Sequence, residues 1–294
     1  MRHLSILISF TLFIGLAIAA RAHGSTVAYY RFEEGTPGNA ATGTGTVLDS
    51  SGNGFNGNPM SSPIYSSNVP VSTVPQTGAP DDVSMHFSGS NVQSVFVPDN
   101  PAFDLTQSLT LEAYFNVAAI PNEAGAIIYR GDSRAGLDPY FMTVQAGANQ
   151  TTTVQFGFFN AANQETSLVA PLPGLNQWVF AAGVLDNSTG KMSLYVNGAL
   201  ANSLTTTSRP LGPLDSSVPG GLAIGSYPVT TFGDAASFDG LIDEVRISNT
   251  ALTPSQFLDA TAVPEPASIG LMAIATGCLL SRKARPNRRG NYPA

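Results

Sequence analysis

The feature that most constrains the fold of this chain is an alternation of apolar and polar side chains with a period of two residues. In SLTLEAYFNV, the apolar side chains of Leu109, Leu111 and Phe115 share one face, and polar side chains occupy the other. KMSLYVNGAL repeats the alternation and then reaches Asn197-Gly198, a dipeptide typical of a β-hairpin turn. Because side chains alternate across a strand and not across a helix, this pattern predicts β-strands.

Similar segments recur along the chain between short clusters of turn-forming residues. VQFGFF, WVFAAGVL and GGLAIGSY are further strand candidates, separated by Gly, Pro, Asn and Ser. The 294 residues include 29 Gly and 21 Pro, and only 11% are charged, which favours a turn-rich β protein. We therefore predict an all-β fold, an antiparallel two-sheet jelly-roll sandwich, with a helical turn only near Thr253 and a helix at each terminus.

The N-terminal segment has the three parts of a secretory signal peptide. Arg2 and His3 precede an apolar run that ends at Ala19, and Ala20-Arg21-Ala22 fits a small-x-small cleavage site. The pattern predicts a signal helix over residues 1–22 that is removed on export, and the alternative is an anchor that is not cleaved.

The body of the chain, residues 23–262, is acidic and contains no cysteine. It carries six Lys and Arg against 19 Asp and Glu, a formal net charge of −13. No basic stripe is present to displace counterions, which argues against nucleic-acid binding. The single cysteine, Cys278, lies beyond the body, so a zinc–thiolate site and a cysteine nucleophile are excluded from it. An exported body of this kind must be stabilised by its core alone, or by its core and a metal.

The C-terminal segment, residues 263–294, changes character in three steps. Pro264-Glu265-Pro266 keeps the chain extended, a short apolar run follows, and Arg282-Lys283 begins a basic end. The apolar run is shorter than the roughly 20 residues of a full membrane span, so it predicts a marginal hydrophobic helix with its basic end in the cytoplasm.

This order of parts resembles the PEP-CTERM sorting signal of exopolysaccharide-producing Gram-negative bacteria. The resemblance implies recognition by a membrane exosortase, cleavage near the motif, and release or attachment outside the cell. The expected location is the extracellular matrix or the outer cell surface, after transient anchoring in the inner membrane. The tail runs on to Ala294, longer than the usual abrupt stop, and an ordinary C-terminal anchor is the alternative.

Four stretches of the body resemble the laminin G-like jelly roll, the concanavalin A-like lectin/glucanase fold. They are AYYRFEEGTPG, VLDSSGNGFNG, QWVFAAGVLDNSTGKMSLYVNG and FDGLIDEVRISNTALTPSQF, which together span about Thr26 to Ala260. In this family a His commonly follows the Trp of the third stretch, whereas Val179 and Phe180 follow Trp178 here. The resemblance implies a single domain over residues 23–262 and a binding or glucanase function.

A carboxyl group in the last stretch is unusual for its position. Strict alternation in FDGLIDEVRIS puts Leu241, Asp243, Val245 and Ile247 on one face, so Asp243 is expected among aliphatic side chains of the core. A lone buried carboxylate costs several kcal/mol unless it is paired or bound to a metal. Either an arginine or a cation must therefore accompany Asp243.

The loop DSSGNG supplies oxygen ligands of the kind that Ca²⁺ prefers. First and last strands commonly lie side by side in a sandwich, so this loop is expected near the closing strand. We predict a structural Ca²⁺ at Asp49, Asn53 and Asp243, with Glu34 as a further ligand. The alternative is that the loop residues bond only their own turn and that Asp243 pairs with an arginine.

The sequence predicts no catalytic residues. Glucanases of this fold carry Glu-x-Asp-x-Glu on one strand, which is absent, and Asp243 and Glu244 are expected to face opposite ways. His86 lies between Met85 and Phe87 and is expected to face away from the core. The prediction is a non-catalytic surface or matrix protein that binds an extracellular polysaccharide or a surface protein; a polysaccharide hydrolase and a purely structural matrix component are the alternatives. Loop residues that contact a ligand, or else only pack, are Tyr129, Arg130, Tyr140, Tyr227 and Phe232.

Overall fold

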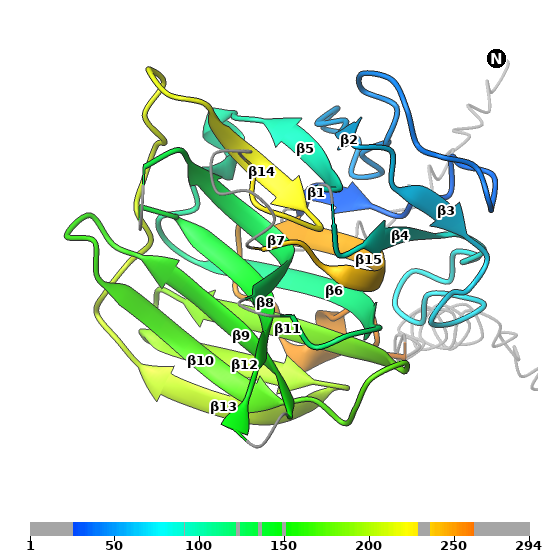
Figure 1. Cartoon of the computed structure of the whole chain (residues 1–294). Coiled ribbons are helices and arrows are strands. Elements are labelled where there is room, and N and C mark those ends of the chain that lie inside the picture. Colours follow the sequence, from blue (N-terminus) through cyan, green and yellow to red (C-terminus); the bar gives the residue numbers. More distant parts are fainter. Residues whose placement is uncertain are drawn as a thin grey trace, which may run out of the picture.

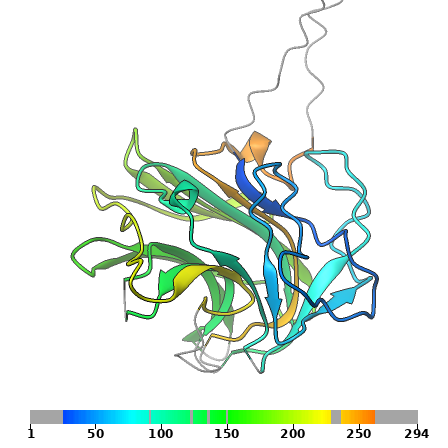
Figure 2. The same cartoon turned by 90° about the horizontal axis from the view of Figure 1, so that it is seen from above.

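Two antiparallel β-sheets pack face to face in the computed structural model, which describes residues 26–261 except 91, 122–123, 135–136, 149–150 and 229–235 (Figure 1; Figure 2). The predicted signal peptide and sorting tail lie outside these residues. One sheet has the order β13 (Ala199–Thr205), β12 (Lys191–Val196), β11 (Trp178–Asp186), β6 (Leu109–Val117), β15 (Asp239–Ser248), β4 (Ser84–Ser88) and β3 (Ile64–Ser66), and β1 (Thr26–Tyr30) also pairs with β15. The other has the order β10 (Glu165–Pro171), β9 (Thr152–Phe159), β8 (Tyr140–Ala146), β7 (Ala124–Asp132), β14 (Gly220–Ile224), β5 (Ser94–Pro98) and β2 (Asn58–Met60).

The all-β sandwich expected from the sequence is thus confirmed. The described residues include two single helical turns, η1 (Pro101–Phe103) and η4 (Pro254–Gln256). The second is the turn expected near Thr253, which caps it. None of the helices in these residues is long and apolar enough to cross a membrane.

The alternation of side chains places the core between the sheets. Leu109, Leu111 and Phe115 of β6 are fully buried there. The Asn197-Gly198 turn joins β12 to β13 with both residues at positive φ, 49° and 75°, as a tight hairpin turn requires. The structure thus confirms both the alternation and the hairpin turn, which are predicted from local sequence patterns.

The outer face of the eight-stranded sheet is also covered, so it buries polar groups. The segment after β15 brings Leu252, Phe257 and Leu258 against aromatic side chains of β6 and β11. Beneath this cover, Arg246 Nε donates to Glu112 Oε2 at 2.7 Å, and both side chains are almost fully buried. Figure 2 shows this orange C-terminal segment beside the blue β1.

A β-bulge in β15 corrects the face assigned to Asp243. The pairing of β15 with β6 shifts between Asp243 and Arg246, and Glu244 has a positive φ of 50°. Ile242 therefore lies in the core, while Asp243 is paired with the outward-facing Tyr114. Asp243 is fully buried, as expected, but on the outer side of the sheet. An extra residue in one strand reverses the alternation beyond it, which strict period-two reasoning does not allow for.

Candidate functional site

Four carboxyl groups gather where the chain leaves β1, enters β4 and passes the bulge of β15. They belong to Glu33, Asp81, Asp243 and Glu244. Ligand oxygens of Glu33, Asp81 and Glu244 all lie within 4.8 Å of one another, and Asp243 interacts electrostatically with Asp81. We call these four residues the acidic cluster. The bulge permits the arrangement, because it turns Glu244 to the same side of the sheet as Asp243.

The acidic cluster is largely buried. Asp81 is 1% exposed, Asp243 and Glu244 are fully buried, and Glu33 is half-buried. Both carboxylate oxygens of Asp81 and Oδ2 of Asp243 have no hydrogen-bond partner among the described residues. Buried polar atoms are nearly always paired in proteins, so these three oxygens need an explanation.

Few positive groups or donors balance the acidic cluster. Glu244 accepts hydrogen bonds from Arg31 Nε at 2.9 Å and from the hydroxyl of Tyr29. Glu33 Oε1 accepts from the backbone N–H groups of Asp82 and Val83, at 2.9 and 3.2 Å. Among the described residues, Arg31 is therefore the cation that forms an ion pair with the acidic cluster, through Glu244.

Burial makes ionisation of these groups unfavourable. It raises the pKa of Asp81 to about 7, although the interaction with Asp243 and, less strongly, the charge of Arg31 act in the opposite direction. It raises the pKa of Glu244 to about 8 against the lowering effect of Arg246. The pKa of Asp243 also lies well above its ordinary value, because of burial first and the neighbouring Asp81 second.

The predicted calcium ligands are distributed over separate places. Asp49 is bonded by its own loop and by β1: Oδ1 accepts from Tyr29 N at 3.0 Å and Ser51 N at 2.9 Å, and Oδ2 accepts from Phe55 N at 3.1 Å. Asn53 Nδ2 donates to the backbone oxygens of Thr26 and Val27.

Glu34 points elsewhere, since its Oε1 accepts from the hydroxyl of Tyr65 at 3.0 Å. Of the four predicted ligands, Asp243 lies in the acidic cluster, and its companions there are Glu33, Asp81 and Glu244. The adjacent acids Glu33-Glu34 and Asp81-Asp82 were visible in the sequence, but which member of each pair turns inward depends on the fold.

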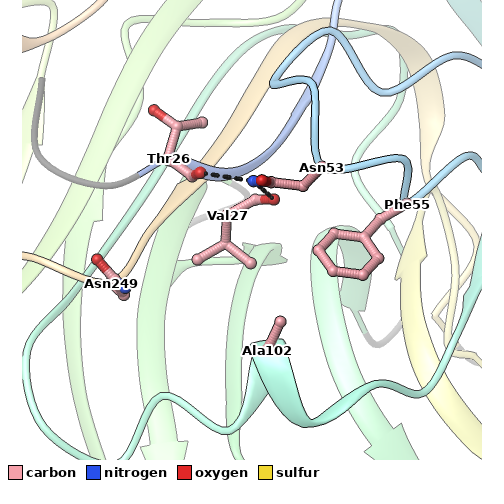
Figure 3. A pocket seen from close by; sticks show the side chains of 6 residues that line it. All are labelled: Thr26, Val27, Asn53, Phe55, Ala102 and Asn249. Carbon is pink, nitrogen blue, oxygen red and sulfur yellow. Dashed lines mark hydrogen bonds between the residues drawn. The ribbon is translucent and has the colours of Figure 1, made fainter.

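An open hollow lies at the edge of the sandwich beside β1. Its volume is about 300 Å³, and it is lined by Thr26, Val27, Asn53, Phe55, Ala102 and Asn249. Figure 3 shows the Asn53 amide bonded to β1, the Phe55 ring near Asn53, Ala102 on the side opposite Asn53, and Asn249 at the end away from Phe55. Asn53, Ala102 and Asn249 are exposed, and the ring of Phe55 packs in a tilted arrangement against Phe103, with ring centroids 5.0 Å apart.

The residues expected in loops as ligand contacts lie mostly in strands and pack inside, because Tyr129 and Arg130 belong to β7 and Tyr140 begins β8. Arg130 and Tyr140 are fully buried, and Arg130 pairs with Asp99 and Asp104. Tyr129 is 9% exposed and packs edge-on against Tyr227, with ring centroids 4.4 Å apart. Phe232 lies outside the described residues. Packing, which was the alternative, therefore accounts for Arg130 and Tyr140. His86 is half-buried beside the core residues Met85 and Phe87, as expected.

Comparison with known proteins gives one family match and several structural neighbours. The family model described as the concanavalin A-like lectin/glucanases superfamily matches residues 88–257. No curated protein matches.

Domain 4 of AbnA, a GH43 extracellular arabinanase from Geobacillus stearothermophilus solved with arabinotriose, is similar in structure. It superposes with a TM-score of 0.52 at 19% identity, over 81% of this chain and 99% of that one. The binding domain of botulinum neurotoxin serotype D gives a TM-score of 0.51 at 14% identity, over 79% of this chain and 50% of that one. At these identities the likeness concerns the fold.

Proposed function

Because the chain belongs to the concanavalin A-like lectin/glucanases superfamily, we propose that it is an exported, non-catalytic domain that binds an extracellular carbohydrate. The observation that carries the proposal is the hollow beside β1 (Figure 3). Two structural neighbours support a binding role: one was solved with arabinotriose, and the other is the binding domain of a neurotoxin.

The chemistry of the hollow suits a neutral sugar. Its volume of about 300 Å³ is at the lower end for ligand sites, which suits one or two sugar rings. Phe55 offers an aromatic ring to the apolar face of a sugar. Asn53 and Asn249 carry side-chain amides, and Thr26 a hydroxyl, which are partners for sugar hydroxyls.

The same lining supports a role without catalysis. None of the six residues that line the hollow has an ionisable side chain. Glycoside hydrolysis needs two carboxyl groups facing the substrate across a cleft. The carboxyl groups with raised pKa values at Glu112 and Asp243 are instead buried in the sheet, where no polysaccharide can reach them.

Filling the hollow tests the proposal. Ala102 is exposed on η1, so Ala102→Trp places an indole in the hollow with little effect on the core. Ala161, in the exposed turn after β9, provides the matched control Ala161→Trp. We expect glycan-array binding by the purified protein, at least tenfold weaker binding in Ala102→Trp, and unchanged binding in Ala161→Trp.

Three other results would contradict it. Equal loss of binding in both variants would remove the hollow from consideration, and capture of a protein ligand without any glycan would favour a protein receptor. Release of reducing sugar from polysaccharides would show an enzyme.

Export and sorting form the second part of the proposal, supported by the order of parts at the two termini. We infer cleavage after Ala22, recognition of Pro264-Glu265-Pro266 by an exosortase, and release or attachment outside the cell. Mass spectrometry of the protein from cell fractions tests this. A mature form that begins at His23 and ends near the motif is expected, whereas a chain intact through Arg289 in the inner membrane would refute it.

A further inference from the structure

We propose that the acidic cluster binds one divalent cation, Ca²⁺ by its chemistry, through carboxylate oxygens of Glu33, Asp81 and Glu244. The site differs from the loop site expected from the sequence, and of the residues expected there only Asp243 lies near it, beside Asp81. The proposal is independent of the hollow and of its ligand.

The geometry of the acidic cluster fits an oxygen-ligated ion. Ca²⁺ binds oxygens at about 2.3–2.6 Å, so two of its ligands are at most about 5 Å apart. The oxygens of Glu33, Asp81 and Glu244 lie within 4.8 Å of one another, which one ion can bridge. Mg²⁺ binds through one or two carboxylates and retains several waters, so three carboxylates around one ion suit Ca²⁺ better. The absence of Cys and His from the set argues against Zn²⁺.

The unpaired oxygens are the observation that points to a ligand. Asp81 Oδ1 and Oδ2 and Asp243 Oδ2 are buried and have no hydrogen-bond partner among the described residues. An unsatisfied buried acceptor costs about 1–3 kcal/mol, and more when it is charged. A cation bound to Asp81 provides the missing partner for its two oxygens and an opposite charge near Asp243.

Charge balance leads to the same conclusion. Four ionised carboxylates beside Arg31 carry a surplus of negative charge, in a region where Asp81 is 1% exposed. The raised pKa values of Asp81 and Asp243 describe the cluster without a cation, in which protonation is the other way to remove the charge. A shared proton between Asp81 and Asp243 is therefore the competing explanation, and the experiment separates the two.

The position of the ligands gives the cation a structural role. Glu33 follows β1, Asp81 precedes β4, and Glu244 belongs to β15. β1 and β4 both pair with β15 and are neighbours in Figure 1. One cation would thus join three segments distant in the sequence, in a body that has no cysteine to form a disulfide.

Thermal unfolding in Ca²⁺ and in EDTA tests the site on the purified full chain. A hundredfold excess of Ca²⁺ over its dissociation constant should raise the Tm by about 5–10 °C, and calorimetric titration should give one ion per chain. Asp81→Asn should bind Ca²⁺ at least tenfold more weakly than the wild type. Asp82→Asn, at the exposed neighbouring position, should respond like the wild type.

The EDTA measurements distinguish the cation from the shared proton. Asp81→Asn in EDTA should unfold at or above the wild-type temperature, because the variant removes an uncompensated charge. Identical wild-type melts in Ca²⁺ and EDTA, with no heat of binding, would overturn the proposal and leave the shared proton. If Asp81→Asn does not fold, the wild-type titration alone still decides the question.

Discussion

Raising the pH from 5 to 8 should weaken the fold through the ionisation of Asp138. This side chain is 8% exposed, and its Oδ2 accepts a hydrogen bond from the Tyr129 hydroxyl at 2.8 Å. Burial raises its pKa to about 7, and the nearby Asp132 acts in the same direction, whereas the Tyr129 bond lowers it. The protonated form is therefore the one that the folded state favours.

The size and the sign follow from linkage. The pKa rises from 3.8 in the unfolded chain to about 7 in the folded one. A raised folded pKa contributes stability that is complete below the unfolded pKa and is lost as the pH rises through the folded pKa. Between pH 5 and about pH 7 the carboxyl group is protonated in the folded chain and ionised in the unfolded one. This interval is about two pH units, and each unit corresponds to about 1.4 kcal/mol, so the free energy of unfolding falls by roughly 2–3 kcal/mol from pH 5 to pH 8.

Urea unfolding of the wild type and of Asp138→Asn at the two pH values, in EDTA, measures this loss. Other buried carboxyl groups also destabilise the wild type as the pH rises, so the informative quantity is the difference between the two proteins. The variant should lose roughly 2–3 kcal/mol less than the wild type. Asp186→Asn is the control, because the pKa of Asp186 is lowered by hydrogen bonds from Ser188 and Thr189, and its titration falls below this range. Equal losses in wild type and Asp138→Asn would refute the reasoning.

Two further substitutions test the packing around the sheets by urea unfolding. Gly183→Ala should destabilise the fold by about 1–3 kcal/mol, because the added Cβ would lie 2.3 Å from the ring of Phe156 in the core; an unchanged midpoint would contradict the packing. Glu112→Ala should cost about 3–5 kcal/mol by leaving the charge of Arg246 buried without its partner, and replacing both by Leu should recover much of that loss.

The strands and the core were predictable because their signals are local. The alternation along β6 and β12 predicts which side chains face inward, and Asn197-Gly198 predicts where the chain turns. The class of fold follows from counting such segments. The burial of the outer face was not predictable in the same way, because Leu252 and Phe257 cover it from a segment that has no regular periodicity.

The acidic cluster could not be predicted from the sequence, because its members are close in space but distant along the chain. Asp243 was identified as a buried carboxyl group in need of a partner, and the structure does bury it. Its neighbours come from positions 33 and 81, and nothing local distinguishes Glu33 from Glu34 or Asp81 from Asp82. Reasoning from composition favoured the loop at Asp49, whose carboxylate the structure instead shows bonded to its own turn and to β1.

The bulge in β15 explains why the adjacent acids Asp243 and Glu244 lie in the same cluster. In a regular strand Asp243 and Glu244 face opposite ways, and one of them would enter the aliphatic core. The positive φ of Glu244, 50°, is uncommon for a residue with a side chain and must be stabilised by its surroundings. Its carboxylate accepts hydrogen bonds from Arg31 and Tyr29, and its N–H donates to Asp243 Oδ1 at 2.8 Å. These contacts offset the backbone cost, and a cation held by Glu244 would add to them, so the conformation of the bulge and the occupancy of the cluster should stabilise each other.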